Sequence, residues 1–318
     1  MDINREYFGK KVLLIGGLGF IGSSLARELA SLGAEVSILT KNREKEANIS
    51  DFKDKIRIIS LDQEKIKGED IKNQDIIFDL AEKKISRQIL EVSDLEEFLK
   101  DRKDFVNMYK KSSSKAKVVY ASSRLVYGLI SEADLPINEN MDLKPFNLYG
   151  HIKKESEEIY KKSILNCVIL RIAVAYGEGA YVKSPTDGII GWFIRRALKD
   201  EELKVYENTS RLRDFIYLQD LISAFLVCGI HHKATNNIFN VGSGEAIRLI
   251  DAAEKITKKV GGGRVEIAPN QNEVDKIDNF YIDTAKINRE LGWRCLHSFD
   301  EGLDKTIEFY RAKLDKYI

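Results

Sequence analysis

Tyr149 and Lys153 are four residues apart in the stretch FNLYGHIKKESEE, whose other residues are typical of a solvated helix. On an α-helix this spacing places the phenol and the ammonium group on one face, one turn apart. Such a pair can transfer protons, because a nearby cation stabilises a phenolate. The spacing alone is weak evidence, since Tyr7 and Lys11 share it in a lysine-rich chain that has 13 tyrosines. The surrounding elements must therefore show whether Tyr149 and Lys153 form a catalytic pair or share this spacing by chance.

A glycine-rich turn, GGLGFIG, supplies Gly16, Gly19 and Gly22 directly after the apolar stretch KVLLI and before a helical pattern. Glycine lets the backbone turn tightly and approach a pyrophosphate, and the start of the following helix offers N–H groups and a positive dipole end. A glycine-rich turn without a ligand is the alternative. The position between a first strand and a helix favours a dinucleotide site.

The end of the second predicted strand bears on which dinucleotide is bound. An acid usually lies there and binds the ribose 2′-hydroxyl. This chain has Thr40, Lys41, Asn42 and Arg43 instead. Two cations and no acid suit a 2′-phosphate and slightly favour NADP over NAD, although a solvated basic turn explains the same residues. Asp62, after the third strand, is a candidate ligand of the adenine amino group or a turn cap.

Ser122 and Ser123 end the fifth predicted strand, AKVVYASS, and the helix carrying Tyr149 follows it. Ligands gather beyond the carboxyl ends of parallel strands, so a serine hydroxyl there can bind a substrate oxygen or satisfy a turn. A tyrosine has a reference pKa of about 10, and bringing it near 7 takes roughly 4 kcal/mol. We expect the Lys153 ammonium and an oxidised nicotinamide ring to supply that stabilisation.

Apolar strands alternate with helical segments through the first half of the chain. The predicted strands are KVLLIGG, EVSILT, IRIIS, DIIFDLA, AKVVYASS and NCVILRIAVAYG. Apolar runs rather than strict alternation indicate a parallel sheet covered on both faces. The sequence therefore predicts an α/β fold, a Rossmann-type doubly wound parallel sheet.

The rhythm changes after Tyr176, where a polar loop leads into helices around residues 246–260 and 284–291, the second with Asp283 as N-cap and Gly292 as its end. IFNVGSG predicts one more strand. We expect a smaller, mostly helical substrate lobe, with some segments returning to the first sheet. The predicted domains are a Rossmann domain of residues 1–173 and 214–245 and a substrate lobe of residues 174–213 and 246–318.

Composition excludes several classes of function. The 318 residues suffice for one large or two modest domains, and a net charge of +1 gives no electrostatic footprint for nucleic acid. The run LISAFLVCGI is too short to span a bilayer, and the N-terminal stretch lacks the apolar core of a signal peptide. Cys167, Cys228 and Cys295 lack metal-ligand spacing and suggest free thiols. A cytoplasmic protein without a metal, membrane or nucleic-acid partner is expected.

The combination Gly16-x-x-Gly19-x-x-Gly22, Ser123 and Tyr149-x-x-x-Lys153 resembles the extended short-chain dehydrogenase/reductase family of nucleotide-sugar epimerases, dehydratases and reductases. Five further segments look like successive landmarks of that family: SSRLVYG, LRIAVAYG, RDFIYLQDLISAF, FNVGSGEAI and LGWRCLHSFDEGL. The resemblance therefore covers nearly the whole chain. It implies a Rossmann domain that binds NAD(H) or NADP(H) and a C-terminal lobe that binds a nucleoside-diphosphate sugar. It also implies a homodimer.

The resemblance implies a role for each matching residue. Tyr149 is the general base and acid, Lys153 lowers its pKa and binds the cofactor ribose, and Ser123 binds the reacting hydroxyl. Arg213 binds the substrate diphosphate by charge-assisted hydrogen bonds. Besides Thr40, Lys41, Arg43, Asp62 and the Tyr149–Lys153 pair, the implied cofactor contacts are Gly16, Gly19, Phe20, Ile21, Gly22, Leu80 and Ala81.

Departures from the family pattern narrow the activity. The sugar dehydratases and decarboxylases place an acid directly before Val-Tyr-Gly, where this chain has Leu125, preceded by Arg124. Water elimination needs an acid to protonate the leaving hydroxyl, so dehydration is disfavoured. The usual His-Leu-Ala-Ala is Asp-Leu-Ala-Glu at residues 79–82, and Val174 replaces a common asparagine. These changes leave the sugar undefined.

Three functions follow. The first is a UDP-glucose 4-epimerase-like enzyme that works by transient oxidation at C4 with a cofactor that stays bound. The second is a reductase of nucleotide 4-keto-6-deoxysugars that consumes NADPH. The third is a non-catalytic relative that binds the cofactor only, although the joint presence of Tyr149, Lys153 and Ser123 argues against it.

Overall fold

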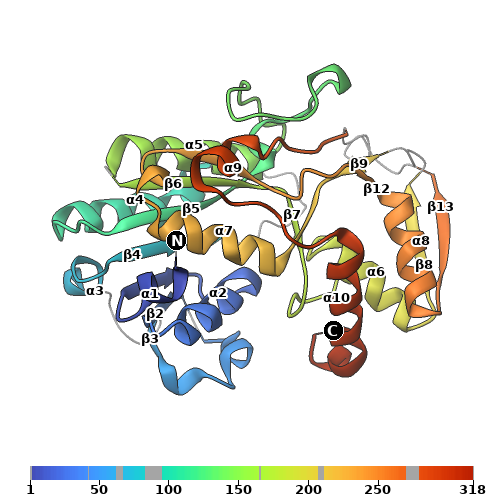
Figure 1. Cartoon of the computed structure of the whole chain (residues 1–318), viewed down its shortest axis with the longest axis horizontal. Coiled ribbons are helices and arrows are strands. Elements are labelled where there is room, and N and C mark those ends of the chain that lie inside the picture. The colour runs from blue at the N-terminus through green and yellow to red at the C-terminus, as the bar shows by residue number, and fades with distance from the viewer. Residues whose placement is uncertain are drawn as a thin grey trace.

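The computed structural model describes residues 2–41, 43–61, 67–82, 95–164, 166–206, 211–269 and 279–317 (Figure 1). Its first half alternates strands and helices as the sequence predicts. The elements up to the sixth strand are α1 (Ile3–Tyr7), β1 (Lys11–Ile15), α2 (Phe20–Ser31), β2 (Glu35–Thr40), β3 (Ile56–Ser60), α3 (Gly68–Lys72), β4 (Ile76–Asp79), α4 (Leu95–Lys111), β5 (Lys117–Ser123), the 3₁₀ helix η4 (Arg124–Val126), α5 (Leu148–Ser163) and β6 (Cys167–Ile172).

The second half contains shorter strands and more helix. Its elements are β7 (Val174–Tyr176), α6 (Ile189–Leu198), β8 (Glu202–Tyr206), β9 (Leu212–Arg213), β10 (Phe215–Tyr217), α7 (Leu218–Ile230), β11 (Ile238–Val241), β12 (Ile247–Arg248), α8 (Leu249–Val260), β13 (Arg264–Ala268), α9 (Ala285–Leu291) and α10 (Phe299–Tyr317). Gly292 ends α9 in the left-handed conformation as predicted. The N-cap position belongs to Thr284, while the Asp283 carboxylate accepts from the Ala285 N–H at 2.7 Å.

Seven parallel strands form the main sheet in the order β11-β6-β5-β4-β1-β2-β3, which confirms the predicted Rossmann-type fold. The strand β11 completes the sheet from the second half of the chain, as expected. The prediction of one continuous strand over NCVILRIAVAYG is wrong. The chain leaves the main sheet at Ala173, whose N–H donates to the Val241 carbonyl at 3.0 Å. β7 then pairs with β10 in a separate two-stranded sheet.

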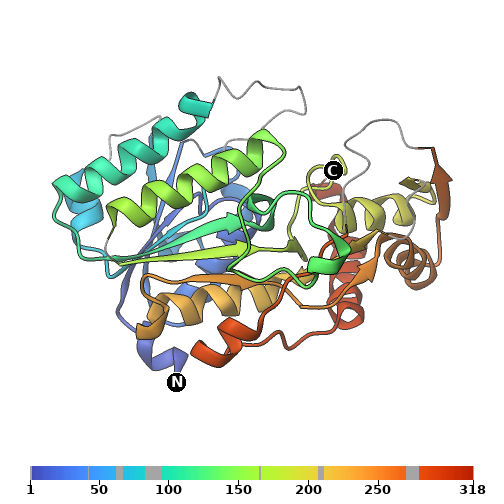
Figure 2. The same cartoon turned by 90° about the horizontal axis from the view of Figure 1, so that it is seen from above.

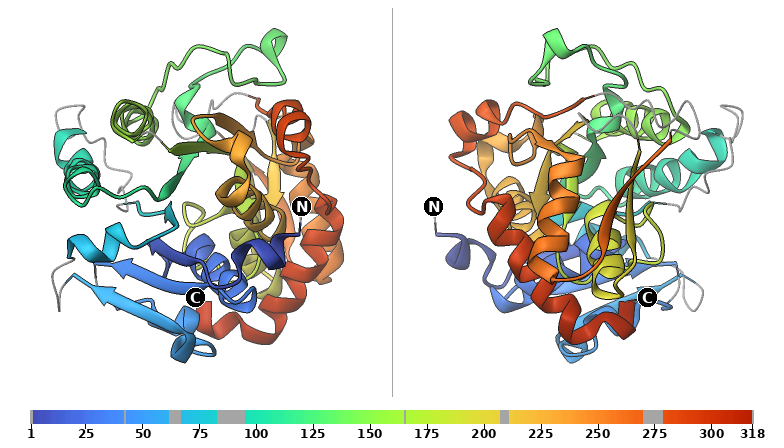
Figure 3. Two further views of the ribbon diagram at one scale, coloured as in Figure 1. Left: turned by 60° about the vertical axis from the view of Figure 1, so that its left-hand side comes forward. Right: turned by 90° about the vertical axis from the view of Figure 1, so that its right-hand side faces the viewer.

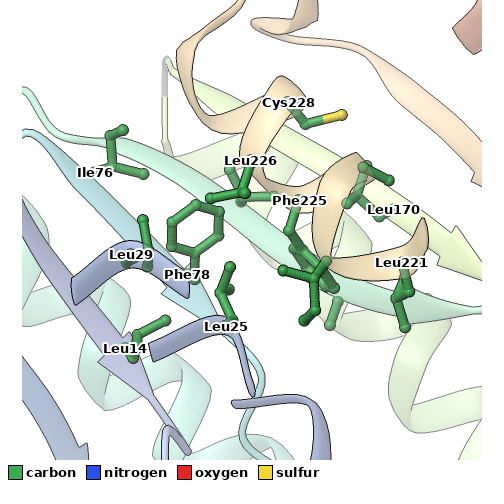
Figure 4. Close-up of a cluster of buried hydrophobic side chains, with 14 of the residues drawn as sticks. Leu14, Leu25, Leu29, Ile76, Phe78, Leu170, Leu221, Phe225, Leu226 and Cys228 are labelled. Carbon is green, nitrogen blue, oxygen red and sulfur yellow. The ribbon is translucent and has the colours of Figure 1, made fainter. Parts of the chain in front are cut away.

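Both faces of the main sheet are covered because its strands are apolar on both sides. Leu14 and Phe78 face a buried cluster made with α2 and α7, which Figure 4 shows around Phe225. Leu13 and Ile77 face the opposite cluster, made with α3, α4 and α5. Figure 2 shows α4 and α5 on one side of the sheet and α7 on the other.

The smaller lobe has a hydrophobic core of its own. Its buried side chains come mainly from α6, α8, α10 and the strands β8 and β10, with Phe193, Ile256 and Leu303 among them. Figure 3 shows α6, α8 and α10 gathered beside the main sheet. α9 belongs elsewhere, because Ile287 and Leu291 pack into the cluster beneath the main sheet.

The Tyr7–Lys11 spacing proves to be a packing feature. Tyr7 is fully buried and its hydroxyl donates to the Leu226 carbonyl at 2.8 Å, while Lys11 is exposed at the start of β1. The cysteines are unpaired, two of them buried and Cys295 half-buried. Among the described residues, no helix combines the length and apolar character needed to cross a membrane.

Candidate active site

The carboxyl ends of the central strands bring the predicted site residues to one edge of the sheet. Ile15 pairs with Asp79, and Asp79 with Tyr120, so β1, β4 and β5 end side by side. The Leu80 N–H donates to the Ile15 carbonyl at 2.9 Å. The glycine turn, Leu80 and the serines after Tyr120 therefore meet where open α/β sheets bind ligands.

The glycine turn needs glycine for steric reasons. Gly16 has a φ of +80°, and a Cβ there would lie 2.8 Å from the Ala81 Cα. A Cβ on Gly22 would lie 2.5 Å from the Gly16 carbonyl oxygen, whereas one on Gly19 would meet only that oxygen, at 3.4 Å.

The helix α2 begins directly after this turn, at Phe20, with Ile21 and Gly22 in its first turn and Gly19 as N-cap. No side chain in the described part of the chain caps it. Its first N–H groups and positive end fit the pyrophosphate of a dinucleotide, which the open side of Gly19 leaves room to approach.

Two cations predicted to bind a 2′-phosphate follow β2, and each has a carboxylate nearby. Lys41 Nζ lies 2.7 Å from an Asp101 carboxylate oxygen, and Arg43 Nε lies 3.5 Å from one of Glu46. Thr40 ends β2 as predicted. Each cation therefore has a carboxylate within ion-pair distance, and the slight preference for NADP over NAD stays a prediction. Asp62, the predicted adenine ligand, lies outside the described residues.

The pair Tyr149 and Lys153 lies in the first turns of α5. This helix packs against residues 122–126, the end of β5 and η4, which we call the serine loop. The Asn147 side chain caps the helix by accepting from the Gly150 N–H at 2.8 Å. A Cβ on Gly150 would lie 2.6 Å from the Leu125 carbonyl oxygen, so the helix start packs directly on η4. Lys153 is 3% exposed, donates to the Ala121 carbonyl at 2.8 Å, and has its Nζ 5.4 Å from the Tyr149 ring centre.

The structure distinguishes the two serines. Ser122 is buried and donates to Glu157 Oε1 at 2.5 Å, inside the protein. Ser123 is half-buried, and its hydroxyl oxygen accepts from the Leu125 N–H at 3.2 Å at the start of η4. Ser123 therefore satisfies a backbone group of the turn after β5, and its role as a substrate ligand stays a prediction.

Arg213 lies on β9, outside the main sheet, and connects to the serine loop through an aromatic ring. Its guanidinium is 5.0 Å from the centre of the Phe280 ring, and that of Arg124 is 3.6 Å from the same ring. Phe280 is buried against Val126 and its neighbours. Sequence analysis missed Phe280, since nothing in its surroundings along the chain signals a site.

A buried charged cluster beside Lys153 was also missed. Glu82 Oε2 lies 2.5 Å from Lys153 Nζ and 3.8 Å from Arg102 Nη2. Arg102 Nη1 lies 2.6 Å from Asp79 Oδ2, which also accepts from the Tyr160 hydroxyl. The unusual residues at positions 79 and 82 thus both act as anionic partners, and Arg102 on α4 links them.

These contacts determine the electrostatics of the pair. Burial raises the pKa of Tyr149 and Glu82 raises it further, while Lys153 and Arg102 lower it, with a net rise above 10. Burial disfavours the Lys153 ammonium, but Glu82, Tyr120 and Tyr149 outweigh it and raise the Lys153 pKa. The expected lowering by Lys153 is real but outweighed, so protein groups alone do not bring the pKa of Tyr149 toward 7.

A family model decides where this fold and site belong. The NAD dependent epimerase/dehydratase family matches residues 12–242, which include the glycine turn, the serines and the Tyr149–Lys153 pair. The chain belongs to this family. The family comprises NAD-dependent enzymes that act on sugar nucleotides as epimerases, dehydratases or reductases.

Individual members of the epimerase/dehydratase family resemble the chain to different extents. A dTDP-4-dehydro-6-deoxyglucose reductase of Escherichia coli is 34% identical over 220 residues, which are 66% of this chain and 65% of the reductase. The structure of an epimerase from Methanothermobacter thermautotrophicus has a TM-score of 0.85 at 25% identity, covering 100% of this chain and 96% of that one. MoeE5 in complex with UDP-glucose and NAD has a TM-score of 0.80 at 25% identity, covering 96% and 99%.

Proposed function

We propose that the protein is a nucleotide-sugar 4-epimerase of the UDP-glucose 4-epimerase type. The observation that supports this most is the placement of Tyr149 and Lys153 against the serine loop, with Leu125 and Arg124 where a dehydratase would need an acid. Proton transfer at a sugar hydroxyl has its base here, whereas elimination of water lacks its acid at these positions. The similarity to a solved epimerase agrees with the proposal.

In this proposal, different residues of the chain transfer the proton, orient the C4 hydroxyl and stabilise the charge that forms. Tyr149 takes the proton of the C4 hydroxyl and later returns it, and Ser123 orients that hydroxyl by a hydrogen bond. Lys153 lies close enough to stabilise the phenolate and to bind the ribose of the cofactor. Arg213, in the smaller lobe, binds the diphosphate and so places the sugar above the sheet edge. The proposed substrate lobe comprises residues 174–213 and 246–318, except that α9 packs beneath the main sheet.

The cofactor we propose is NAD, held by the glycine turn, Leu80, Ala81 and Lys153. When bound, NAD would supply the hydride acceptor and donor for C4, so that hydride could return to the other face of the turned keto sugar. The ion pairs of Lys41 with Asp101 and of Arg43 with Glu46 favour NAD over NADP. The positive charge of the oxidised ring adds to that of Lys153 and would help to lower the pKa of Tyr149.

A 4-ketosugar reductase is the second candidate. The 34% identity with the reductase of Escherichia coli, over two thirds of this chain, supports it. The same residues would then return a proton from Tyr149 to the C4 oxygen. A reductase consumes its dinucleotide, whereas an epimerase keeps it through each cycle, and this difference separates the two.

The test is a pair of assays on the purified protein. UDP-, dTDP-, CDP- and GDP-sugars are incubated without added cofactor, and one C4 pair should interconvert. In parallel, a nucleotide 4-keto-6-deoxysugar is offered with NADPH or NADH, and absorbance at 340 nm should stay constant. Loss of absorbance without C4 interconversion would establish the reductase instead, and silence in both assays would support a relative that only binds the cofactor.

A further inference from the structure

Glu82 brings a carboxylate next to the lysine of the Tyr149–Lys153 pair. It directly follows Leu80 and Ala81, on the loop that touches the glycine turn. Its side chain is 22% exposed, while that of Lys153 is 4% exposed. Its Oε2 lies 2.5 Å from Lys153 Nζ, so the carboxylate and the ammonium group are in direct contact.

This contact has two opposite consequences. A buried ammonium without an anionic partner tends to lose its proton, so Glu82 keeps Lys153 charged. The same negative charge offsets the field of Lys153 at the phenol of Tyr149, which makes the phenolate harder to form. Glu82 therefore holds Lys153 charged while limiting what that charge does to its neighbour.

Other charged groups in the cluster are paired among themselves. Besides Glu82, the titratable groups that face Lys153 are Tyr149 on α5, Tyr120 on β5 and Arg102 on α4. Arg102 in turn faces Asp79 on β4 and Tyr160 on α5. Arg102 is bound most closely to Asp79, at 2.6 Å, and is 3.8 Å from Glu82. Among the residues that the structure describes, Glu82 is thus the carboxylate in direct contact with Lys153, and its charge is the one that a substitution can remove without orphaning Arg102.

We propose that Glu82 is a positioning residue that holds the Lys153 ammonium beside Tyr149 and, by offsetting its charge, sets the pH at which Tyr149 exchanges a proton with the substrate. The inference rests on the proposed function. Removal of the Glu82 charge should favour the phenolate and extend activity to lower pH.

The experiment measures kcat/KM against pH for the wild-type holoenzyme and for Glu82→Gln, with the sugar pair found in the epimerase assay. The acidic limb should move to lower pH by roughly one unit in Glu82→Gln, the size of shift that one nearby charge produces. Glu82→Asp keeps the charge on a shorter side chain and should give an intermediate midpoint. Glu158→Gln, an exposed change on α5, should leave the profile unchanged.

A second readout does not depend on turnover. The tyrosinate absorbance of the NAD-saturated wild type and of each Glu82 variant is titrated against pH. The same titration is made with Tyr149→Phe added to each protein, and the difference between the two curves reports the ionisation of Tyr149. Its midpoint should fall in Glu82→Gln by the same amount. Unchanged midpoints in both readouts, in an active Glu82→Gln enzyme, would overturn the inference. If the tyrosinate midpoint of Glu82→Gln lies below that of the wild type but the wild type converts no sugar, the proposed function is refuted while the effect of Glu82 on Tyr149 is supported.

Discussion

Lys153 is the residue on which the site's charge balance depends. Its ammonium is buried between the Ala121 carbonyl and the Glu82 carboxylate, one helical turn from Tyr149. Burial by itself would favour the neutral amine, and the close carboxylate reverses that preference. The proposed role of Tyr149 as a base therefore also relies on the positive charge of an oxidised cofactor, because burial outweighs Lys153 and raises the pKa of Tyr149.

The proposed preference for NAD over NADP concerns two other side chains, Lys41 and Arg43. Wild-type protein should bind NAD more tightly than NADP, by up to about tenfold, since a 2′-phosphate would have to compete with Asp101 and Glu46 for these cations and each exposed ion pair is worth up to about 1 kcal/mol. The Lys41→Ala and Arg43→Ala variants should keep their NAD affinity within about twofold, because NAD has no 2′-phosphate for either cation to bind. Titration calorimetry with each dinucleotide checks this. Tighter binding of NADP, lost in Arg43→Ala, would contradict it.

The helix α5 is the element that joins catalysis to the sheet. Its first turn rests on η4, Lys153 reaches the backbone of β5, and Glu157 forms an ion pair with Arg171 of β6 at 2.7 Å. Both partners of that pair are almost fully buried. The position of Tyr149 therefore depends on contacts several residues along the same helix.

Loss of the buried ion pair should destabilise the fold strongly. Glu157→Ala would leave the Arg171 guanidinium buried without its carboxylate, and we expect the free energy of unfolding to fall by about 3–5 kcal/mol. Glu158→Ala, one residue along, removes exposed pairs with Lys161 and Lys162 and should cost less than about 1 kcal/mol. Urea unfolding of both variants measures the difference. Equal losses would show that the buried pair does not anchor α5.

The glycine turn should separate folding from cofactor binding. Gly22→Ala puts a methyl group 2.5 Å from the Gly16 carbonyl oxygen, so it should lower both the thermal midpoint and the NAD affinity. Gly19→Ala meets only the same oxygen, at 3.4 Å, so it should keep the thermal midpoint and weaken NAD binding about tenfold or more. Unfolding scans and NAD titrations distinguish the two. Normal NAD affinity in Gly19→Ala would place the pyrophosphate elsewhere.

The sequence predicted those features that depend on residues close together in the chain, namely strands, tight turns and helix ends. Apolar runs and the glycine turn located the sheet and the cofactor edge, and Gly292 marked a helix end. The break at Ala173 was missed because the apolar stretch continues through it, and its cause is pairing with β10, far along the chain. Arg102 was missed because it looks like any charged residue of a solvated helix. Only the packing of α4 brings it to Asp79, 23 residues earlier.

At the scale of the whole molecule, buried tyrosines should make the free energy of unfolding decrease in alkaline solution. Burial raises the pKa of Tyr7, Tyr120 and Tyr160 above the ordinary value of 10. A pKa raised by folding means that the contribution to stability is complete below about pH 10 and is lost as pH rises through the folded values.

The free energy of unfolding should therefore fall above pH 10, with a slope of up to about 1.4 kcal/mol per pH unit for each tyrosine that titrates on unfolding. Urea unfolding at a series of pH values from 7 to 11 measures it. Tyr7→Phe should reduce the slope by one such increment, because that phenol no longer titrates. Stability that stays constant or rises above pH 10 would contradict the burial of these phenols.

The most direct test of the account is the rate of C4 interconversion by NAD-saturated wild type, Tyr149→Phe and Tyr7→Phe. The two tyrosines have a lysine at the same spacing, but the hydroxyl of Tyr7 donates to a core carbonyl. We predict that Tyr149→Phe slows turnover by at least about 100-fold with its fold intact, because it loses its acid–base group, while Tyr7→Phe turns over like wild type. Wild-type rates in Tyr149→Phe would contradict the account.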